Sequence, residues 1–154
     1  MISSSRNKGF SLVELLVAVT IMLILAGAVG VRVWQWVPKA RVARAQSDIE
    51  ALKAAVALYR ADNFAVPSQR QGLDALIAKP TLPPLPKFWR EGGYLDSAVL
   101  PTDPWGSPYV YLCPGTRGEQ FEILSYGSDG APGGEGEAAD ISSSAGQAAN
   151  AAIP

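Results

Sequence analysis

Hydrophobic and polar positions divide the chain into an apolar run, an amphipathic stretch and a polar, irregular remainder. From Phe10 to Val31, about 22 residues include a single ionisable side chain, and an α-helix of that length spans a hydrocarbon core of about 30 Å. The sequence therefore predicts a transmembrane helix over residues 10–31. A polar and basic leader, residues 1–9, precedes this run, so cleavage after Gly9 would leave the apolar segment on the mature protein.

A helical periodicity follows the apolar run. Apolar residues recur there at spacings of three and four, which is one stripe of an amphipathic helix. This stripe consists of Val42, Ala45, Ile49, Leu52, Val56 and Tyr59. The opposite face is charged, and we interpret it as an ordinary solvated face. The helix is therefore predicted to continue over residues 32–62.

Residues 63–141 are predicted to form one small globular domain. A short helix is expected near residues 73–78, and a proline-rich loop follows it. Two short strands are predicted, near residues 109–113, where the run alternates, and near residues 120–125, joined by a turn in a small antiparallel sheet. The predicted fold class is thus α+β, with a long N-terminal helix packed on a small antiparallel sheet.

The end of the chain and its composition add few chemical options. Residues 142–154 are rich in Ala and Ser and uncharged, which predicts a flexible tail. The chain has no histidine and one cysteine, so it cannot build an intrachain disulfide, a His-ligated metal site or a Cys–His nucleophilic pair. Cys113 lies in an alternating run and is interpreted as a buried strand residue. The net charge of −1 indicates no basic surface for nucleic acid.

Glu14 is the one carboxylate of the apolar run. A charge inside a membrane helix costs about 2.5–3.5 kcal/mol on insertion scales, and such residues usually have a function. The nearest candidate partner is the α-amino group that cleavage would create on Phe10, four residues away on the same helix face, or the same amine of a neighbouring copy. The alternative is an interfacial glutamate beside the basic leader.

The loop over residues 129–140 is the strongest candidate for ligand chemistry. It is rich in glycine and contains four carboxylates: Asp129, Glu135, Glu137 and Asp140. Such hard oxygen ligands on a backbone able to bend suit a calcium ion. The loop has the length of an EF-hand loop, but Ala131 and Gly133 stand where that loop needs ligating side chains. Composition leaves two alternatives, a metal-binding loop and a disordered acidic turn.

The string Gly9-Phe10-Ser11-Leu12-Val13-Glu14 resembles the class III prepilin signal shared by type IV pilins and the pseudopilins of type II secretion. The resemblance implies that a membrane peptidase cuts between Gly9 and Phe10 and N-methylates Phe10. It also implies that Glu14 guides subunit docking. Basic residues flank the apolar run on both sides, which alone would favour a cytoplasmic C-terminal domain. The signal instead implies an N-terminus in the cytoplasm.

Further blocks are similar, in order, to the major pseudopilin of type II secretion: Gln71–Leu76, Gly92–Leu95, Leu100–Tyr109 and Ser125–Gly130. The resemblance implies one structural calcium bound by Asp129, Asp140 and the backbone carbonyl of Tyr126. Glu137 is a further candidate ligand, because Ala139 stands where many relatives have a second aspartate. Type IV major pilins tend instead to close their C-terminal region with a disulfide, which one cysteine cannot form.

The resemblance implies a structural filament subunit rather than an enzyme. It would be a single-pass protein of a bacterial inner membrane, with its C-terminal domain in the periplasm, and would polymerise into a pseudopilus that drives folded exoproteins through the outer membrane. The implied partners are further copies, minor pseudopilins, the prepilin peptidase, an inner-membrane assembly platform with its ATPase, and an outer-membrane secretin. Two alternatives are a type IV pilus or minor pilin-like subunit and a monomeric membrane-anchored periplasmic binding domain.

Overall fold

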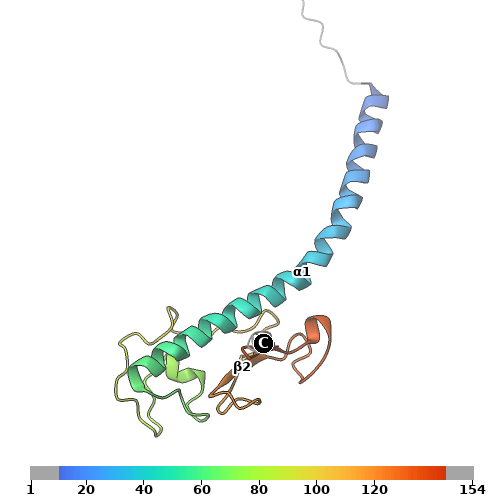
Figure 1. Cartoon of the computed structure of the whole chain (residues 1–154). Coiled ribbons are helices and arrows are strands. Elements are labelled where there is room, and N and C mark those ends of the chain that lie inside the picture. The colour runs from blue at the N-terminus through green and yellow to red at the C-terminus, as the bar shows by residue number, and fades with distance from the viewer. Residues whose placement is uncertain (1–10, 145–154) are drawn as a thin grey trace, which may run out of the picture. The chain divides into compact units, whose positions relative to one another are not determined.

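The computed structural model describes residues 11–144, within which the side chains of residues 26–35 are not described. The chain forms two compact units, Met1–Pro38 and Lys39–Pro154. Its elements in chain order are α1 (Leu12–Asn63), the 3₁₀-helix η1 (Leu73–Leu76), the strands β1 (Val110–Leu112) and β2 (Glu122–Ser125), the 3₁₀-helix η2 (Gly136–Ala138), and the strand β3 (Ile141–Ser142) (Figure 1).

The helix α1 joins the predicted apolar run and the predicted amphipathic stretch in 52 residues. It ends one residue beyond the predicted boundary, and Pro38 lies inside it without ending it. Residues 11–25 are exposed along their whole length. No helix in the described part of the chain combines the length and the hydropathy needed to cross a membrane. Of the predicted span 10–31, residue 10 and the side chains of 26–31 lie outside that part.

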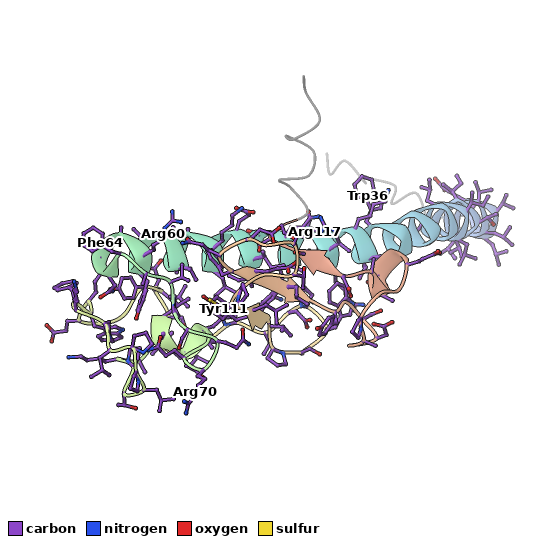
Figure 2. All side chains as sticks on the ribbon, turned by 60° about the horizontal axis from the view of Figure 1, so that its bottom comes forward. Trp36, Arg60, Phe64, Arg70, Tyr111 and Arg117 are labelled. Atoms are coloured by element: carbon purple, nitrogen blue, oxygen red, sulfur yellow. The ribbon has the colours of Figure 1, made fainter. Side chains whose placement is uncertain are left out.

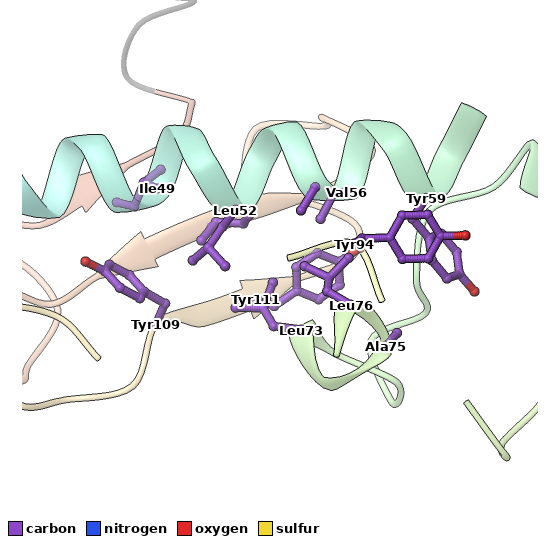
Figure 3. Close-up of a cluster of buried hydrophobic side chains, with 12 residues drawn as sticks. Ile49, Leu52, Val56, Tyr59, Leu73, Ala75, Leu76, Tyr94, Tyr109 and Tyr111 are labelled. Atoms are coloured by element: carbon purple, nitrogen blue, oxygen red, sulfur yellow. The ribbon is translucent and has the colours of Figure 1, made fainter. Parts of the chain in front are cut away.

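In the second unit, the apolar stripe of α1 forms one wall of the core, as its spacing predicted. Ile49, Leu52, Val56 and Tyr59 are each at most 2% exposed. Figure 3 shows them pointing toward the strands and η1, where they meet a second set of buried side chains. That set comprises Leu73, Ala75, Leu76, Tyr94, Tyr109, Tyr111 and Ile123. Each large aliphatic side chain buried in this way contributes about 1.5–3 kcal/mol of transfer free energy, which holds the helix on the sheet.

The sheet has three strands in the order β1-β2-β3, and both pairs are antiparallel. Val110 is opposite Leu124 across the first pair, and Leu124 is opposite Ser142 across the second. β1 and β2 lie inside the two predicted strand ranges, each shorter at its ends. The α+β architecture, with a long N-terminal helix and a small antiparallel sheet, is therefore confirmed.

The prediction of a flexible tail over residues 142–154 was wrong at its start. Ser142 belongs to β3, and Ser143 and Ser144 are buried. The Ser143 N–H donates to the Ile123 carbonyl at 2.8 Å, and its hydroxyl oxygen accepts the Ile123 N–H at 3.0 Å. Hydrogen bonding, rather than an apolar pattern, holds this segment, so hydropathy gave no sign of it. Residues 145–154 lie outside the described range.

The stretch Asp103-Pro104-Trp105-Gly106 is a turn organised by a buried carboxylate. Asp103 Oδ1 accepts the N–H groups of Trp105 at 3.1 Å and Ser107 at 2.8 Å, and Oδ2 accepts the Ser125 hydroxyl at 2.6 Å. Because Ser125 is the last residue of β2, Asp103 ties this turn to the strand from which the acidic loop departs.

Candidate functional site

The residues of the predicted processing site, Gly9 and Phe10, lie outside the described range. Glu14 lies in the first turn of α1 and is exposed. A carboxylate there interacts favourably with the N-terminal end of the helix dipole. Its own helix surrounds it with large exposed apolar side chains, among them Leu12 at 80% and Leu16 at 61% exposed. An apolar surface of this extent marks a region that contacts lipid or protein.

The acidic loop leaves β2 at Ser125 and returns at β3, and it closes on itself through backbone hydrogen bonds. The Ser128 N–H donates to the Glu137 carbonyl at 2.9 Å, and the Asp140 N–H donates to the Gly133 carbonyl at 3.1 Å. Gly127 is required at the first of these contacts, because a Cβ there would lie 2.5 Å from the Glu137 carbonyl oxygen and its φ is +65°. The described loop is therefore ordered by contacts between its two limbs.

The two aspartates expected as ligands hold their own loop. Asp129 Oδ1 accepts the Ala131 N–H at 3.1 Å, and Asp140 Oδ2 accepts the Gly133 N–H at 3.0 Å. Each of these hydrogen bonds engages one oxygen of an exposed carboxylate. Tyr126 stands at the start of the loop, half-buried, and Glu135 is exposed.

Glu137 differs from the other acidic residues of the loop because it reaches α1. Its Oε1 is buried, makes no hydrogen bond within the described residues, and lies 3.5 Å from Arg41 Nη1. A carboxylate oxygen taken out of water needs a compensating charge or donor. The Arg41 guanidinium supplies that charge.

Calcium, the metal that the sequence suggests, needs several oxygen ligands around one point. No three Asp, Glu, Cys or His side chains of the described residues come together as a metal-binding group. Side chains alone therefore do not form a site. An oxygen-only set of Asp129, Asp140 and loop carbonyls still fits calcium, which accepts carbonyl oxygens and water in flexible geometry, whereas zinc would require nitrogen or sulfur ligands.

Sequence reasoning missed Glu122, the most heavily hydrogen-bonded carboxylate of the domain. It accepts the Thr116 N–H at 2.9 Å and hydroxyl at 2.5 Å, and the hydroxyls of Ser142 at 2.5 Å and Ser144 at 2.9 Å. Burial raises the pKa of this carboxyl, but the hydroxyl and amide donors outweigh burial and lower the pKa to about 2. The sequence gives one sign of this buried carboxylate, a charged side chain within the otherwise apolar run Phe121-Glu122-Ile123-Leu124. All its donors are neutral, so the arrangement supports the fold rather than catalysis.

A half-buried polar contact joins the sheet side of the core to α1. The Tyr109 hydroxyl donates to Asp48 Oδ2 at 3.0 Å, and Asp48 lies 3.7 Å from Arg44 Nε. Burial, followed by the hydrogen bond to Asp48, raises the pKa of Tyr109. Tyr109 is therefore a neutral donor throughout the physiological range.

Known proteins resemble the chain over most of its length. The family model for protein G of the type II secretion system matches residues 32–144, and the prokaryotic N-terminal methylation motif matches residues 4–30. Type II secretion system core protein G of Pseudomonas aeruginosa is 48% identical over 136 residues, which cover 88% of this chain and 94% of that protein. The Vibrio cholerae protein of the same name is 44% identical over 136 residues, covering 88% and 90%.

A solved structure agrees with these relatives. The major pseudopilin from the type 2 secretion system of enterohaemorrhagic Escherichia coli matches with a TM-score of 0.59 and 41% sequence identity. The match covers 68% of this chain and 87% of the solved one.

Proposed function

The chain belongs to the protein G family of type II secretion systems, the pseudopilins, and from this premise we propose that it polymerises into a periplasmic pseudopilus that drives folded exoproteins through the outer membrane. The observation that carries the proposal is the first part of α1. Residues 11–25 present apolar side chains to every side with Glu14 as their only charge. Lipid before assembly and a bundle of identical helices afterwards would both cover such a surface.

The match to the methylation motif supports processing between Gly9 and Phe10. On this proposal, Phe10 becomes the N-methylated first residue, and Glu14 pairs with that amine in its own or a neighbouring copy. The protein would be anchored in the inner membrane by one span, with its second unit in the periplasm. Its partners would be further copies, minor pseudopilins, the prepilin peptidase, the assembly platform with its ATPase, and the secretin. The chain itself would perform no catalysis.

We further propose that the acidic loop binds one structural calcium ion through Asp129, Asp140 and backbone carbonyls that include Tyr126. The support is an oxygen-only donor set on a loop already folded around these two residues. Glu137 is left out of this ligand set, because its buried oxygen lies beside Arg41. The ion would add positive charge where four carboxylates repel one another.

Substitution of Glu14 tests the filament. Glu14→Ala should still insert and be processed, because losing the charge removes an insertion penalty, but it should fail to assemble, because the Phe10 amine loses its counter-charge. The matched control is Thr20→Ala, in the same exposed segment, where the hydroxyl donates to the Leu16 carbonyl of its own helix at 2.7 Å. Cross-linked ladders and exoprotein secretion should persist in the control. Normal ladders and secretion in Glu14→Ala would refute the docking role.

A further inference from the structure

The large exposed apolar side chains of the second unit gather in one part of it. All of those in residues 39–144 lie between Leu58 and Val99, in the last turns of α1 and the loop after it. Four of them follow α1 in the chain and form what we call the apolar end: Phe64, Leu82, Leu85 and Phe88. An exposed apolar group of this kind usually marks an interaction site.

Phe64 is the unusual member of the apolar end. It has a φ of +59°, a left-handed conformation that bulky residues rarely adopt, and its side chain is 87% exposed. Its N–H donates to the Arg60 carbonyl at 2.7 Å, so Phe64 occupies the helix-terminating position where glycine is usual. Neither the backbone nor burial within the chain favours phenylalanine here. A strained residue that contributes nothing to its own core points to a role outside it.

Hydrogen bonds hold the backbone of part of the apolar end. The side-chain oxygen of Asn63, next to Phe64, accepts the Phe88 N–H at 2.9 Å, and the Gln71 amide donates to the carbonyls of Leu82 and Pro84. Arg90 adds a bidentate pair with Asp62 at 2.7 and 3.1 Å. A surface ordered before binding loses less conformational entropy on binding.

A groove with complementary properties lies about 22 residues earlier along α1, or about 33 Å at the rise of a helix. It has a volume of about 460 Å³ and lies between α1 and the acidic loop. Its apolar lining consists of Val42, Ile49, Ala139 and Ile141. Glu50 and Asp140 stand in the same lining. We call it the acidic groove.

The two surfaces carry opposite charge. The two segments that line the groove, taken as residues 39–53 of α1 and residues 119–140, hold eight acidic residues against four basic ones, whereas residues 60–91 hold five basic residues against three acidic ones. Figure 2 shows two of the basic residues, Arg60 and Arg70, in the same part of the unit as Phe64. Opposite charges around apolar centres guide association and fix orientation.

We propose that the apolar end of one copy docks into the acidic groove of a second copy, with the Phe64 ring against Val42 and Ile141. A second copy is the occupant because both complementary surfaces lie on this chain and are too far apart to meet within it. Contact between two different surfaces is heterologous, so it continues from copy to copy instead of closing a pair. The inference rests on the proposed filament and names a contact of the second unit within it.

Disulfide trapping tests the contact in the full chain, in cells, with Cys113→Ser as the background. Phe64→Cys combined with Gln46→Cys, whose side chain lines the acidic groove, should give an oxidised ladder of covalent multimers. Phe64→Cys combined with Arg117→Cys, in the exposed turn between β1 and β2, should not. A ladder from the control pair alone, or bonds to a different protein only, would overturn the interface. Absence of filaments from the wild-type chain would instead defeat the proposed function itself.

Phe64→Gly provides a second test that does not depend on added cysteines. Glycine removes the left-handed strain, so the full chain in detergent should melt a few degrees higher than wild type. Assembly into sedimentable filaments should nevertheless fall about tenfold, because a buried aromatic anchor is lost. A purely structural Phe64 would leave assembly intact, and wild-type filament yield in Phe64→Gly would overturn the proposal.

Discussion

The two units of the chain use apolar residues in opposite ways. In the first, residues 11–25 expose their side chains on every side of α1. In the second, the same helix buries a stripe against the sheet and η1. Hydrophobicity is high in both, so the difference lies in whether the chain supplies the covering surface. The second unit contains its own covering surface, whereas none of the described residues covers residues 11–25.

A pair of leucine truncations would sharpen this contrast most. Leu52→Ala, at a side chain 1% exposed, should lower the free energy of unfolding by about 2–5 kcal/mol, because it leaves a cavity in the core. Leu16→Ala, at a side chain 61% exposed, should change it by less than about 0.5 kcal/mol. Denaturant unfolding of the full chain in detergent measures both. Equal losses would show that residues near Leu16 pack within the chain after all.

Acid titration of Glu122 probes the polar side of the second unit. Its pKa is lowered from 4.5 to about 2, so the carboxylate contributes stability above pH 4.5 that is lost as the pH falls toward 2. Glu122→Gln should therefore cost about 3 kcal/mol at pH 7, and the difference from wild type should shrink between pH 4.5 and 2. The matched control, Glu50→Gln, removes an exposed carboxylate that pairs with Lys53 at 3.2 Å. A difference from wild type that does not vary with pH would contradict this assignment.

Thermal melting with and without calcium tests the acidic loop of the same unit. A ligand that binds only the folded state stabilises it by about 2.7 kcal/mol at a hundred times its Kd, so melting should shift upward with calcium relative to chelator. Asp129→Ala and Asp140→Ala should each abolish most of the shift, and Glu135→Ala should retain it. Magnesium should substitute poorly, because it requires tighter octahedral geometry. Indifference of the wild-type melting temperature to calcium would leave the loop as a solvated acidic turn.

The smallest change in stability is expected from the loss of an arginine of α1, and it should differ between Arg41 and Arg44. Arg41→Ala should lower the stability of the calcium-free chain by about 1–3 kcal/mol, because it leaves a buried Glu137 oxygen without its counter-charge. Arg44→Ala breaks an exposed i,i+4 pair with Asp48 and should cost less than about 0.5 kcal/mol. Hydrogen exchange at the Ser128 amide, which donates to the Glu137 carbonyl, should accelerate only in Arg41→Ala. Equal protection in both variants would remove Arg41 from the control of the loop.

Periodic features of this fold could be read from the sequence. The buried stripe of α1 follows from spacings of three and four, and β1 lies in an alternating run, whereas all four residues of β2 are buried. β3 and η2 could not be predicted in this way, because neither lies in a longer run of alternating or helically spaced apolar residues. The left-handed Phe64 escaped notice because terminating signals are glycines, and this residue is bulky.

Polar contacts between residues far apart in the sequence were the other part of the candidate site that could not be predicted. Composition identified the acidic loop, and the structure brings Asp129 and Asp140 into hydrogen bonds with that loop. The pairing of Glu137 with Arg41 joins residues almost a hundred positions apart, and no local pattern indicates such a contact. Glu122 likewise collects its donors from two separate segments. Such groups become visible only when the fold places them together.

The donors to Glu122 also give the sheet an order of formation. Thr116 is six residues away, whereas Ser142 and Ser144 are 20 and 22 residues away. Because longer loops cost more entropy to close, the β1–β2 hairpin should gather around the carboxylate first, and β3 should dock onto a half-satisfied acceptor. Truncation of Thr116 should then slow folding. Truncation of Ser142 should mainly speed unfolding. The Glu122 side chain thus stabilises the turn between β1 and β2 early in folding and holds β3 in place late in folding.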